Sequence, residues 1–219
     1  MGNTAQGLDP DTLAAVASDV KGVKDLGTEI AVVVGAGNIM RGVKAEKQGI
    51  DRVTGDYMGM IATVINALAL QAAFENAGMA SRVQSAIRMD GVVEPYVRQR
   101  AMEHLAKGRI IIFAGGTGNP YFTTDTAAAL RAVEIHADVM CKATKVDGIF
   151  DKDPEIHKDA VFLPEVTYRE AIDKNLGVMD LTAITLCRDH KLPILVVKMK
   201  GDNMRKAVMG EPIGTIVRR

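Results

Sequence analysis

The chain has 219 residues, of which 47% are hydrophobic and 25% charged, proportions typical of a globular protein rather than of a disordered or fibrous one. Its 27 basic and 27 acidic side chains cancel, so no overall charge favours nucleic acid or an anionic membrane. Aromatic residues make up 4%, without tryptophan, which disfavours a stacking surface for single-stranded nucleic acid. The start of the chain lacks a secretion-signal pattern, and no apolar run reaches the roughly 18 residues that span a bilayer. We therefore expect a cytoplasmic protein with no nucleic-acid or membrane partner, whose Cys141 and Cys187 are core residues.

The first third of the chain predicts a helix, a strand and a second helix. An Asp-Pro pair at residues 9–10 is a typical helix start, and apolar residues then recur at helical spacing up to Gly27. The β-branched run 29–34 predicts a buried strand that ends in glycines. The apolar stretch 58–74 predicts a buried helix, for which Asp56 is most simply the N-cap.

The same alternation continues to the end of the chain. Further strands are predicted at residues 80–85, 109–114, 138–142, 193–198 and 214–217, and helices at residues 94–106, 124–136, 179–190, 202–209 and after a capping box at 167–170. Alternating strands and helices predict an α/β three-layer sandwich, with a mostly parallel sheet covered by helices on both faces. No repeat or linker divides the sequence, so we expect a single domain over residues 1–219.

Two glycine-rich loops follow predicted strands. The first is 35–38 (Gly-Ala-Gly-Asn), with Arg41 shortly after it, and the second is 115–120 (Gly-Gly-Thr-Gly-Asn-Pro). Backbone amides at the carboxyl ends of parallel strands bind anions, so the pair of loops predicts phosphate binding, to which the Arg41 guanidinium would add. Glycines that only turn the chain, and a solvated arginine, are the alternatives. Neither the dinucleotide fingerprint nor the P-loop motif is present, which disfavours hydride transfer and Walker-type hydrolysis.

Polar residues follow the second loop and a later strand. Thr123, Thr124 and Asp125 stand at a predicted helix start, where capping accounts for one of the three well. An aspartate beside a phosphate loop is unfavourable unless a cation lies between them, so Asp125 predicts a lysine ammonium or Mg²⁺ there. The stretch 142–153 could hold a base, a ribose and phosphates, although a charged loop is the simpler interpretation. The four histidines lack metal-ligand or triad spacing.

Five segments closely resemble the bacterial UMP kinases, a branch of the amino acid kinase family. They are residues 35–42, 55–60, 116–125, 142–148 and 188–193, and the resemblance extends over essentially the whole chain. It implies the amino acid kinase fold and the reversible transfer of the ATP γ-phosphoryl group to UMP, with Mg²⁺, to give UDP and ADP. It also implies a homohexamer, with GTP as an activator and UTP as an inhibitor.

The resemblance assigns roles to single residues. The residues that would contact UMP are Ala36, Asp56, Thr117, Gly118, Asn119, Pro120, Tyr121, Phe122, Thr123 and Thr124. Those that would contact ATP are Gly37 and Arg41 at the transferring phosphates, and Thr144, Phe150 and Asp153 at the nucleoside. Asp125 and Arg41 would be catalytic, and Lys142 is our candidate for a phosphate-facing lysine, with a solvated strand-end lysine as the alternative. No residue set is expected to bind a metal by itself.

The sequence departs from the family at two points. Ala36 stands where many members have the middle one of three glycines, which raises a mild steric question. The family's first strand ends in a Lys-Leu-Ser-Gly-Glu motif that grips the ATP phosphates, and the sequence starts with residues similar to the loop after it. We expect a form without that strand to be unstable and slow, because losing one charge-stabilising group alone costs about 10²- to 10³-fold. Either a natural chain that extends upstream of Met1 supplies the strand, or the sequence is a damaged or altered copy of a family member, and we favour the first.

Two other functions stay open. One is a nucleotide-binding oligomeric subunit that binds UMP or UTP without turnover. The other is a kinase of the same fold that acts on carbamate or an amino-acid carboxylate, which Asp56 and the 117–125 segment disfavour. A phosphoryl transfer to UMP needs no general base, since a nucleoside monophosphate has a second pKa of about 6. Positioning and charge neutralisation would then carry the catalysis.

Overall fold

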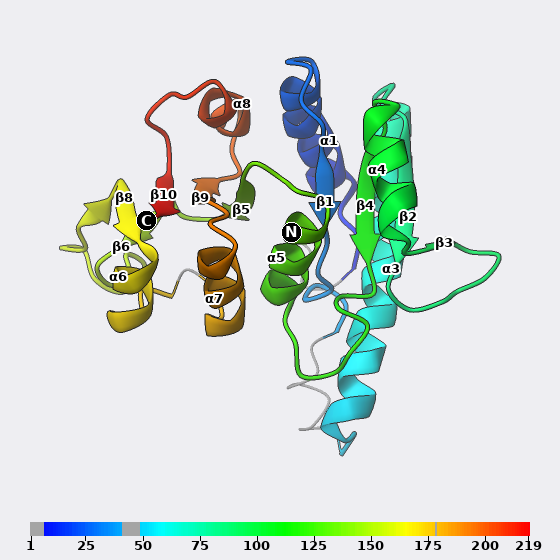
Figure 1. Cartoon of the computed structure of the whole chain (residues 1–219), viewed down its shortest axis with the longest axis horizontal. Helices are drawn as coiled ribbons and strands as arrows, with labels where there is room; N and C mark the ends of the chain where they lie inside the picture. Colours follow the sequence, from blue (N-terminus) through cyan, green and yellow to red (C-terminus); the bar gives the residue numbers. More distant parts are fainter. Residues whose placement is uncertain (1–6, 41–48, 178) are drawn as a thin grey trace. The chain divides into compact units, whose positions relative to one another are not determined.

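The computed structural model describes residues 7–40, 49–177 and 179–219. They form two compact units, and the division between Ala127 and Ala128 falls inside helix α5 (Thr124–Glu134). Each unit has a four-stranded sheet with helices packed against it (Figure 1). The predicted α/β class is confirmed, and the single domain stays a prediction.

The first unit contains a sheet of parallel strands. Its order is β1 (Ala31–Val33), β4 (Ile110–Ala114), β2 (Ser81–Ser85) and β3 (Glu94–Pro95). Every residue of β4 is buried, as expected for a strand with both faces covered. Val33 pairs with Phe113, and Ser85 pairs with Ala114, so β1, β4 and β2 end at the same edge of the sheet.

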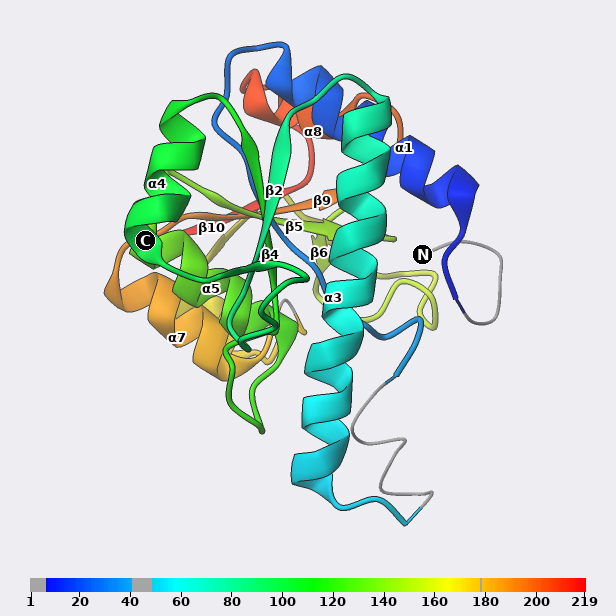
Figure 2. The same ribbon diagram turned by 90° about the vertical axis from the view of Figure 1, so that its right-hand side faces the viewer.

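Helices cover both faces of this sheet. One face packs against α1 (Pro10–Lys24) and α3 (Arg52–Asn76). The buried cluster there includes Val64, Ala67, Leu70 and Phe74 of α3 with Val83, Ile110 and Ile112 of the strands. Helix α4 (Arg98–Ala106) lies on the opposite side of β2 and β4 from α3 (Figure 2).

The helix ends test the predicted caps. Asp9 caps α1 as predicted, because its carboxylate accepts a hydrogen bond from the N–H of Asp11. The prediction that Asp56 caps α3 is wrong: the N-cap is Asp51, which accepts hydrogen bonds from two backbone N–H groups of the first turn. The first turn of α3 has Val53 as its one apolar side chain beside Arg52, Thr54 and Gly55, so the helical apolar pattern is not recognisable there. Gly78, two residues after the end of this helix, has a φ of +79°, the left-handed conformation in which glycine commonly ends helices.

Helix α3 has an exposed apolar stripe, which consists of Val53, Tyr57, Ile61, Ile65 and Leu68. Their spacing of three or four residues places them on one side of the helix. Among the described residues, α3 is the one helix long and apolar enough to cross a membrane. Its other side packs against the sheet, however, which is the arrangement of a core helix.

A polar cluster lies between β2, β3 and α4. The buried Gln84 amide donates to Oε2 of Glu94 at 3.3 Å, and Nε2 of His104 lies 3.1 Å from the same oxygen. Arg109 donates to Nδ1 of His104, so Nε2 carries the proton that bonds Glu94. Burial raises the pKa of Glu94, but the hydrogen bonds from His104 and Gln84 outweigh it and leave this pKa below its ordinary value.

The helix predicted at 94–106 is shorter in the structure. Residues Glu94–Pro95 form β3, and α4 begins only at Arg98. Glu94 precedes Pro95, and a residue before proline favours an extended backbone. The spacing of apolar residues, from which the helix is predicted, carries no information about this preference.

The second unit has a mixed sheet. Its order is β5 (Met140–Thr144), β9 (Ile194–Lys198), β10 (Thr215–Arg218) and β8 (Glu165–Thr167), in which β9 and β10 are antiparallel and the other pairs parallel. The strands β6 (Ile149–Phe150) and β7 (Phe162–Leu163) pair with each other in a separate antiparallel ribbon. The helices that follow are α6 (Tyr168–Asp173), α7 (Leu181–Asp189) and α8 (Asn203–Val208). The sequence missed β6, β7 and β8, because two or three residues are too short for a recognisable period.

The core of the second unit lies around β9 and α7. Cys187 is fully buried there, as predicted, and burial raises the pKa of its thiol to about 12. Cys141 is exposed, so its predicted core position is wrong. It lies on β5, where Met140 is the one buried residue. The predicted capping box of α6 is present, with Thr167 and Glu170 bonding each other's backbone N–H groups.

Candidate functional site

The first glycine loop leaves the end of β1. The carbonyl of Ala36 accepts hydrogen bonds from the N–H groups of Ile39 and Met40, which closes a tight turn. The methyl group of Ala36 is buried, so the structure accommodates a side chain where many family members have glycine. A Cβ atom on Gly35 would lie 3.0 Å from Oγ1 of Thr124, and the first loop therefore packs closely against the end of the second loop. Gly37 lies within the same turn, and Arg41 lies outside the described residues.

The second glycine loop leaves β4, the neighbour of β1. Gly115, Gly116 and Gly118 have φ values of +76°, +58° and +81°. At Gly115 a Cβ atom would lie only 2.8 Å from the Ser85 hydroxyl and 2.9 Å from the backbone nitrogen of Ile87. Glycine is therefore required at this position both by conformation and by space.

Asp56 holds the second loop at its far end. The carboxylate accepts a hydrogen bond from the N–H of Tyr121 at 2.8 Å and forms an ion pair with Arg52 at 2.9 Å. Tyr121 has a φ of +71°, and the Arg52 guanidinium lies 5.7 Å from the centre of its ring. A carboxylate can accept about four hydrogen bonds, so these contacts leave Asp56 capacity for a ligand hydroxyl. Asp56 and Tyr121, both predicted to contact UMP, thus lie together.

The residues after the loop begin helix α5. The Thr123 hydroxyl accepts hydrogen bonds from the N–H groups of Asp125 and Thr126, so the capping interpretation holds for Thr123. Thr124 faces Gly35 in the first loop. Asp125 is half-buried in the first turn of α5, where the partial positive charge of a helix N-terminus favours its carboxylate.

Within the second loop, Thr117 and Asn119 bond each other's backbone, which shapes the loop locally. The side chains of Tyr121 and Phe122 are largely exposed. The first unit therefore brings the two loops, Asp56 and Asp125 into one region at the carboxyl edge of its sheet. Such an edge, with glycines and a helix start, is suited to phosphate.

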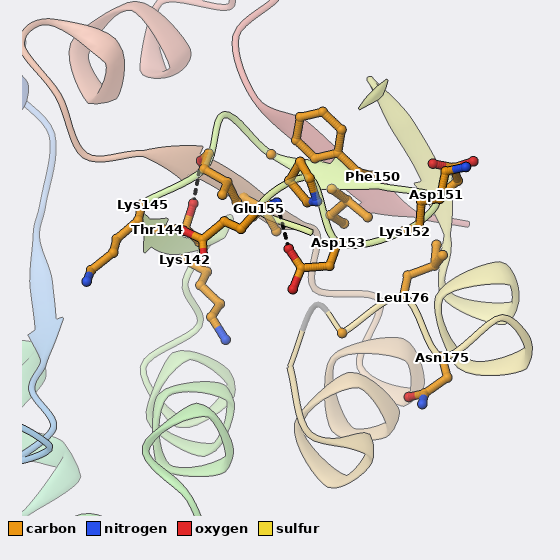
Figure 3. Close-up of a pocket in the computed structure, with 16 residues that line it drawn as sticks. Lys142, Thr144, Lys145, Phe150, Asp151, Lys152, Asp153, Glu155, Asn175 and Leu176 are labelled. Carbon is orange, nitrogen blue, oxygen red and sulfur yellow. Dashed lines mark hydrogen bonds between the residues drawn. The ribbon is translucent and has the colours of Figure 1, made fainter. Parts of the chain in front are cut away.

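The second unit contains a pocket of about 520 Å³ at the end of β5, within the size range of small-molecule sites. Its lining includes Lys142, Thr144, Phe150 and Asp153, the four residues of this unit predicted to contact ATP or phosphate. Figure 3 shows these residues around the pocket, with Leu176 from after α6 on the side away from Lys145.

Local hydrogen bonds shape this pocket. The Thr144 hydroxyl donates to the carbonyl of Val146 at 2.6 Å, and the Asp153 carboxylate accepts from the N–H of Glu155 at 2.8 Å (Figure 3). The ring of Phe150 packs edge-on against Phe162, with centroids 5.5 Å apart. An aromatic ring, a hydroxyl and lysines around one cavity can hold a base, a sugar and phosphates.

Gly148 lines the pocket at a point where the backbone is closely surrounded. A Cβ atom there would lie 2.6 Å from Oγ1 of Thr215 and 2.7 Å from the ring of Phe162. The same Thr215 hydroxyl accepts a hydrogen bond from the N–H of Ile149, which fixes β6 against β10. The backbone at Gly148 is thus a point of close approach to β7 and β10.

Sequence reasoning missed two residues of α3, Thr63 and Asn66. The Thr63 hydroxyl accepts a hydrogen bond from the N–H of Gly115, and the Asn66 amide donates to the carbonyl of Gly35. The sequence contains a weak indication of their role, because both are polar residues within an apolar segment and their spacing of three places them on one side of the helix.

Mg²⁺ was predicted as part of the chemistry. Within residues 7–40, 49–177 and 179–219, no group of three or more His, Cys, Asp or Glu side chains is placed to hold a metal ion.

The two glycine loops at the carboxyl edge of one sheet and the pocket at the end of β5 form an arrangement suited to phosphorylated ligands. Residues 1–198 match the model of the amino acid kinase family, and the chain belongs to this family.

The chain is also similar to several solved structures. The chain is similar to the UMP kinase from Bacillus anthracis, with 37% identity, a TM-score of 0.96 and coverage of 99% of this chain and 90% of that one. For the UMP kinase from Ureaplasma parvum the identity is 33% and the TM-score 0.93, with 100% and 94% covered. The uridylate kinase from Archaeoglobus fulgidus has 29% identity and a TM-score of 0.76, with 95% and 93% covered.

Proposed function

We propose that the chain is a UMP kinase, which transfers the γ-phosphoryl group of MgATP to UMP and releases UDP and ADP. The observation that carries this proposal is the second glycine loop, which starts at a required glycine and is held at Tyr121 by Asp56. The similar proteins from Bacillus anthracis and Ureaplasma parvum are UMP kinases by name, which supports the same activity here. The donor would bind in the pocket of the second unit, and UMP at the loops of the first.

The chemistry follows from the ionisation of the substrates. The phosphate of UMP is mostly a dianion at neutral pH, so one of its oxygens attacks the γ-phosphorus of ATP without a general base. A bond forms between that oxygen and the γ-phosphorus, the bond from the γ-phosphorus to the bridging β-phosphate oxygen breaks, and ADP is released. Mg²⁺ bound to the nucleotide phosphates would neutralise part of their charge. The residues supply position and charge: loop amides hold the acceptor, Lys142 neutralises phosphate, and Asp125 orients cationic groups.

An oligomer is part of the proposal. The five exposed apolar residues of the α3 stripe lie side by side on one face of the helix rather than scattered singly over the surface. Contiguous exposed apolar surfaces of this kind mark contacts with other chains. We expect a homohexamer in the cytoplasm, activated by GTP and inhibited by UTP. Light scattering of the purified protein measures the mass directly, and Ile61→Glu on the stripe should lower it.

The activity is tested with the purified protein, ATP, Mg²⁺ and one acceptor at a time. We expect turnover with UMP well above that with CMP, AMP or GMP. Turnover with carbamate or glutamate but not UMP would refute the proposal. Binding of UMP by calorimetry without turnover would instead support the alternative of a regulatory subunit.

A further inference from the structure

Helix α3 contacts both glycine loops through polar side chains. Oγ1 of Thr63 accepts a hydrogen bond from the N–H of Gly115 at 2.7 Å and donates to the carbonyl of Met60 at 2.6 Å. Both hydrogen-bonding directions of this buried hydroxyl are thus used, and one of them fixes the first residue of the second loop.

Asn66 makes the corresponding contact with the first loop. Its Nδ2 donates to the carbonyl of Gly35 at 2.7 Å and to Oδ1 of Asn38 at 2.7 Å. The Asn38 amide returns a hydrogen bond of 3.1 Å to Oδ1 of Asn66 and donates another to the carbonyl of Gly7. Both ends of the first loop are therefore bonded to a single side chain of α3.

The helix fixes the distance between Thr63 and Asn66. Thr63 and Asn66 are three residues apart on one helix, so they share a face and lie about 4.5 Å apart along its axis. The loops themselves start from β1 and β4, which pair directly with Val33 beside Phe113. Two neighbouring strands and one helix thus determine where both loops lie.

We propose that Thr63 and Asn66 are positioning residues, through which α3 holds the first and the second glycine loop at a fixed separation. The inference rests on the proposed function, because the fixed separation matters when one loop holds UMP and the other meets the transferred phosphoryl group. Phosphoryl transfer involves little covalent chemistry by the protein, and a misplacement of about 1 Å can cost about 10²-fold in rate.

A pair of substitutions at residue 63 tests the hydroxyl. Thr63→Val keeps the shape and removes the hydrogen bond, whereas Thr63→Ser keeps the hydroxyl. We expect Thr63→Val to lower kcat by about 10- to 100-fold, with the KM values for UMP and ATP changed less than about threefold, because each nucleotide still finds its own loop. Thr63→Ser should stay within about threefold of the parent protein.

Asn66→Leu should lower kcat in the same way, and Gln71→Leu is its matched control. Gln71 also lies on α3 and donates to Glu75 and to the carbonyl of Ser81, away from both loops. The control should leave kcat unchanged. An equal loss in Gln71→Leu, or no rescue by Thr63→Ser, would show that the effect is general damage to the helix and would overturn the inference.

A measurement without substrate separates this inference from the proposed function. Amide hydrogen exchange at Gly115, followed by NMR, should accelerate in Thr63→Val and not in Thr63→Ser or Gln71→Leu. Unchanged exchange in Thr63→Val overturns the inference even if UMP is a substrate. Faster exchange with no turnover of UMP by the parent protein sustains the anchoring and refutes the kinase proposal. If Thr63→Val does not fold, the comparison of Asn66→Leu with Gln71→Leu decides.

Discussion

Replacing Gly115 by alanine should damage the second loop more than any conformational preference alone would. The φ of +76° costs an alanine about 1–2 kcal/mol. The added Cβ would also lie 2.8 Å from the Ser85 hydroxyl, 2.9 Å from the nitrogen of Ile87 and 3.0 Å from that of Ala86. Two of these three atoms are backbone, so a change of rotamer cannot relieve the contacts, and overpacking of this kind costs about 1–3 kcal/mol.

The two effects together lower the free energy of unfolding by about 2–5 kcal/mol. For a chain of this size each kcal/mol lowers Tm by about 2–4 °C, so the expected decrease is about 4–20 °C. The shifted backbone would also carry the Gly115 N–H away from Thr63, which should lower kcat.

Gly91→Ala is the matched control for Gly115→Ala. Gly91 has a similar φ of +82°, but nothing lies within 4 Å of a Cβ atom built there. It should lose about 1–2 kcal/mol, which corresponds to about 2–8 °C, and keep its kcat. Circular dichroism and a coupled kinase assay measure both quantities. Equal losses in the two variants would refute the steric argument for Gly115.

Three further predictions address the catalytic residues, the donor pocket and the polar cluster. Asp125→Asn should lower kcat by at least about 10²-fold and change UMP affinity little, since it removes a charge that acts in the transition state; an unchanged kcat would remove Asp125 from the catalytic residues. Gly148→Ala should raise the KM for ATP and not that for UMP, because its Cβ would collide with atoms beside the donor pocket; steady-state kinetics with each nucleotide varied gives both constants. Burial raises the pKa of Glu94, but hydrogen bonds from His104 and Gln84 outweigh burial and hold this pKa below the ordinary value of 4.5. The ionised carboxylate therefore stabilises the fold above pH 4.5, and this contribution is lost as pH falls through the lowered pKa. Urea denaturation should therefore show the parent protein more stable than Glu94→Gln at pH 7, with the difference shrinking below about pH 4.5, and a difference independent of pH would contradict the role of Glu94.

The sequence predicts elements well where a single local cause decides them. The Asp9 cap, the capping box before α6 and the strand at 110–114 all depend on neighbouring residues or on a continuous apolar run. The sequence predicts elements less well where the first turn of a helix holds a single apolar side chain, as in α3, or where strands are too short for a period. The positive φ of Tyr121 has no local cause either, because a contact with Asp56, 65 positions away, holds that backbone.

The candidate site divides in the same way. The glycine loops are recognisable because clustered glycines directly after an apolar strand form a local pattern that is typical of anion-binding loops. The pocket residues Thr144, Phe150 and Asp153 follow from the resemblance. Thr63 and Asn66 are different, since the same residues in an apolar helix could equally bond their own backbone. Only the fold reveals that their partners are loops 52 and 31 positions away.

The paired amides of Asn38 and Asn66 have a consequence for how this protein can vary. Each side chain gives one hydrogen bond to the other and takes one back, so a hydrophobic replacement at either position leaves its neighbour's amide with a lost partner. As lineages of this enzyme diverge, the two positions should change together rather than singly. A library randomised at both sites should accordingly yield working combinations that neither site permits alone.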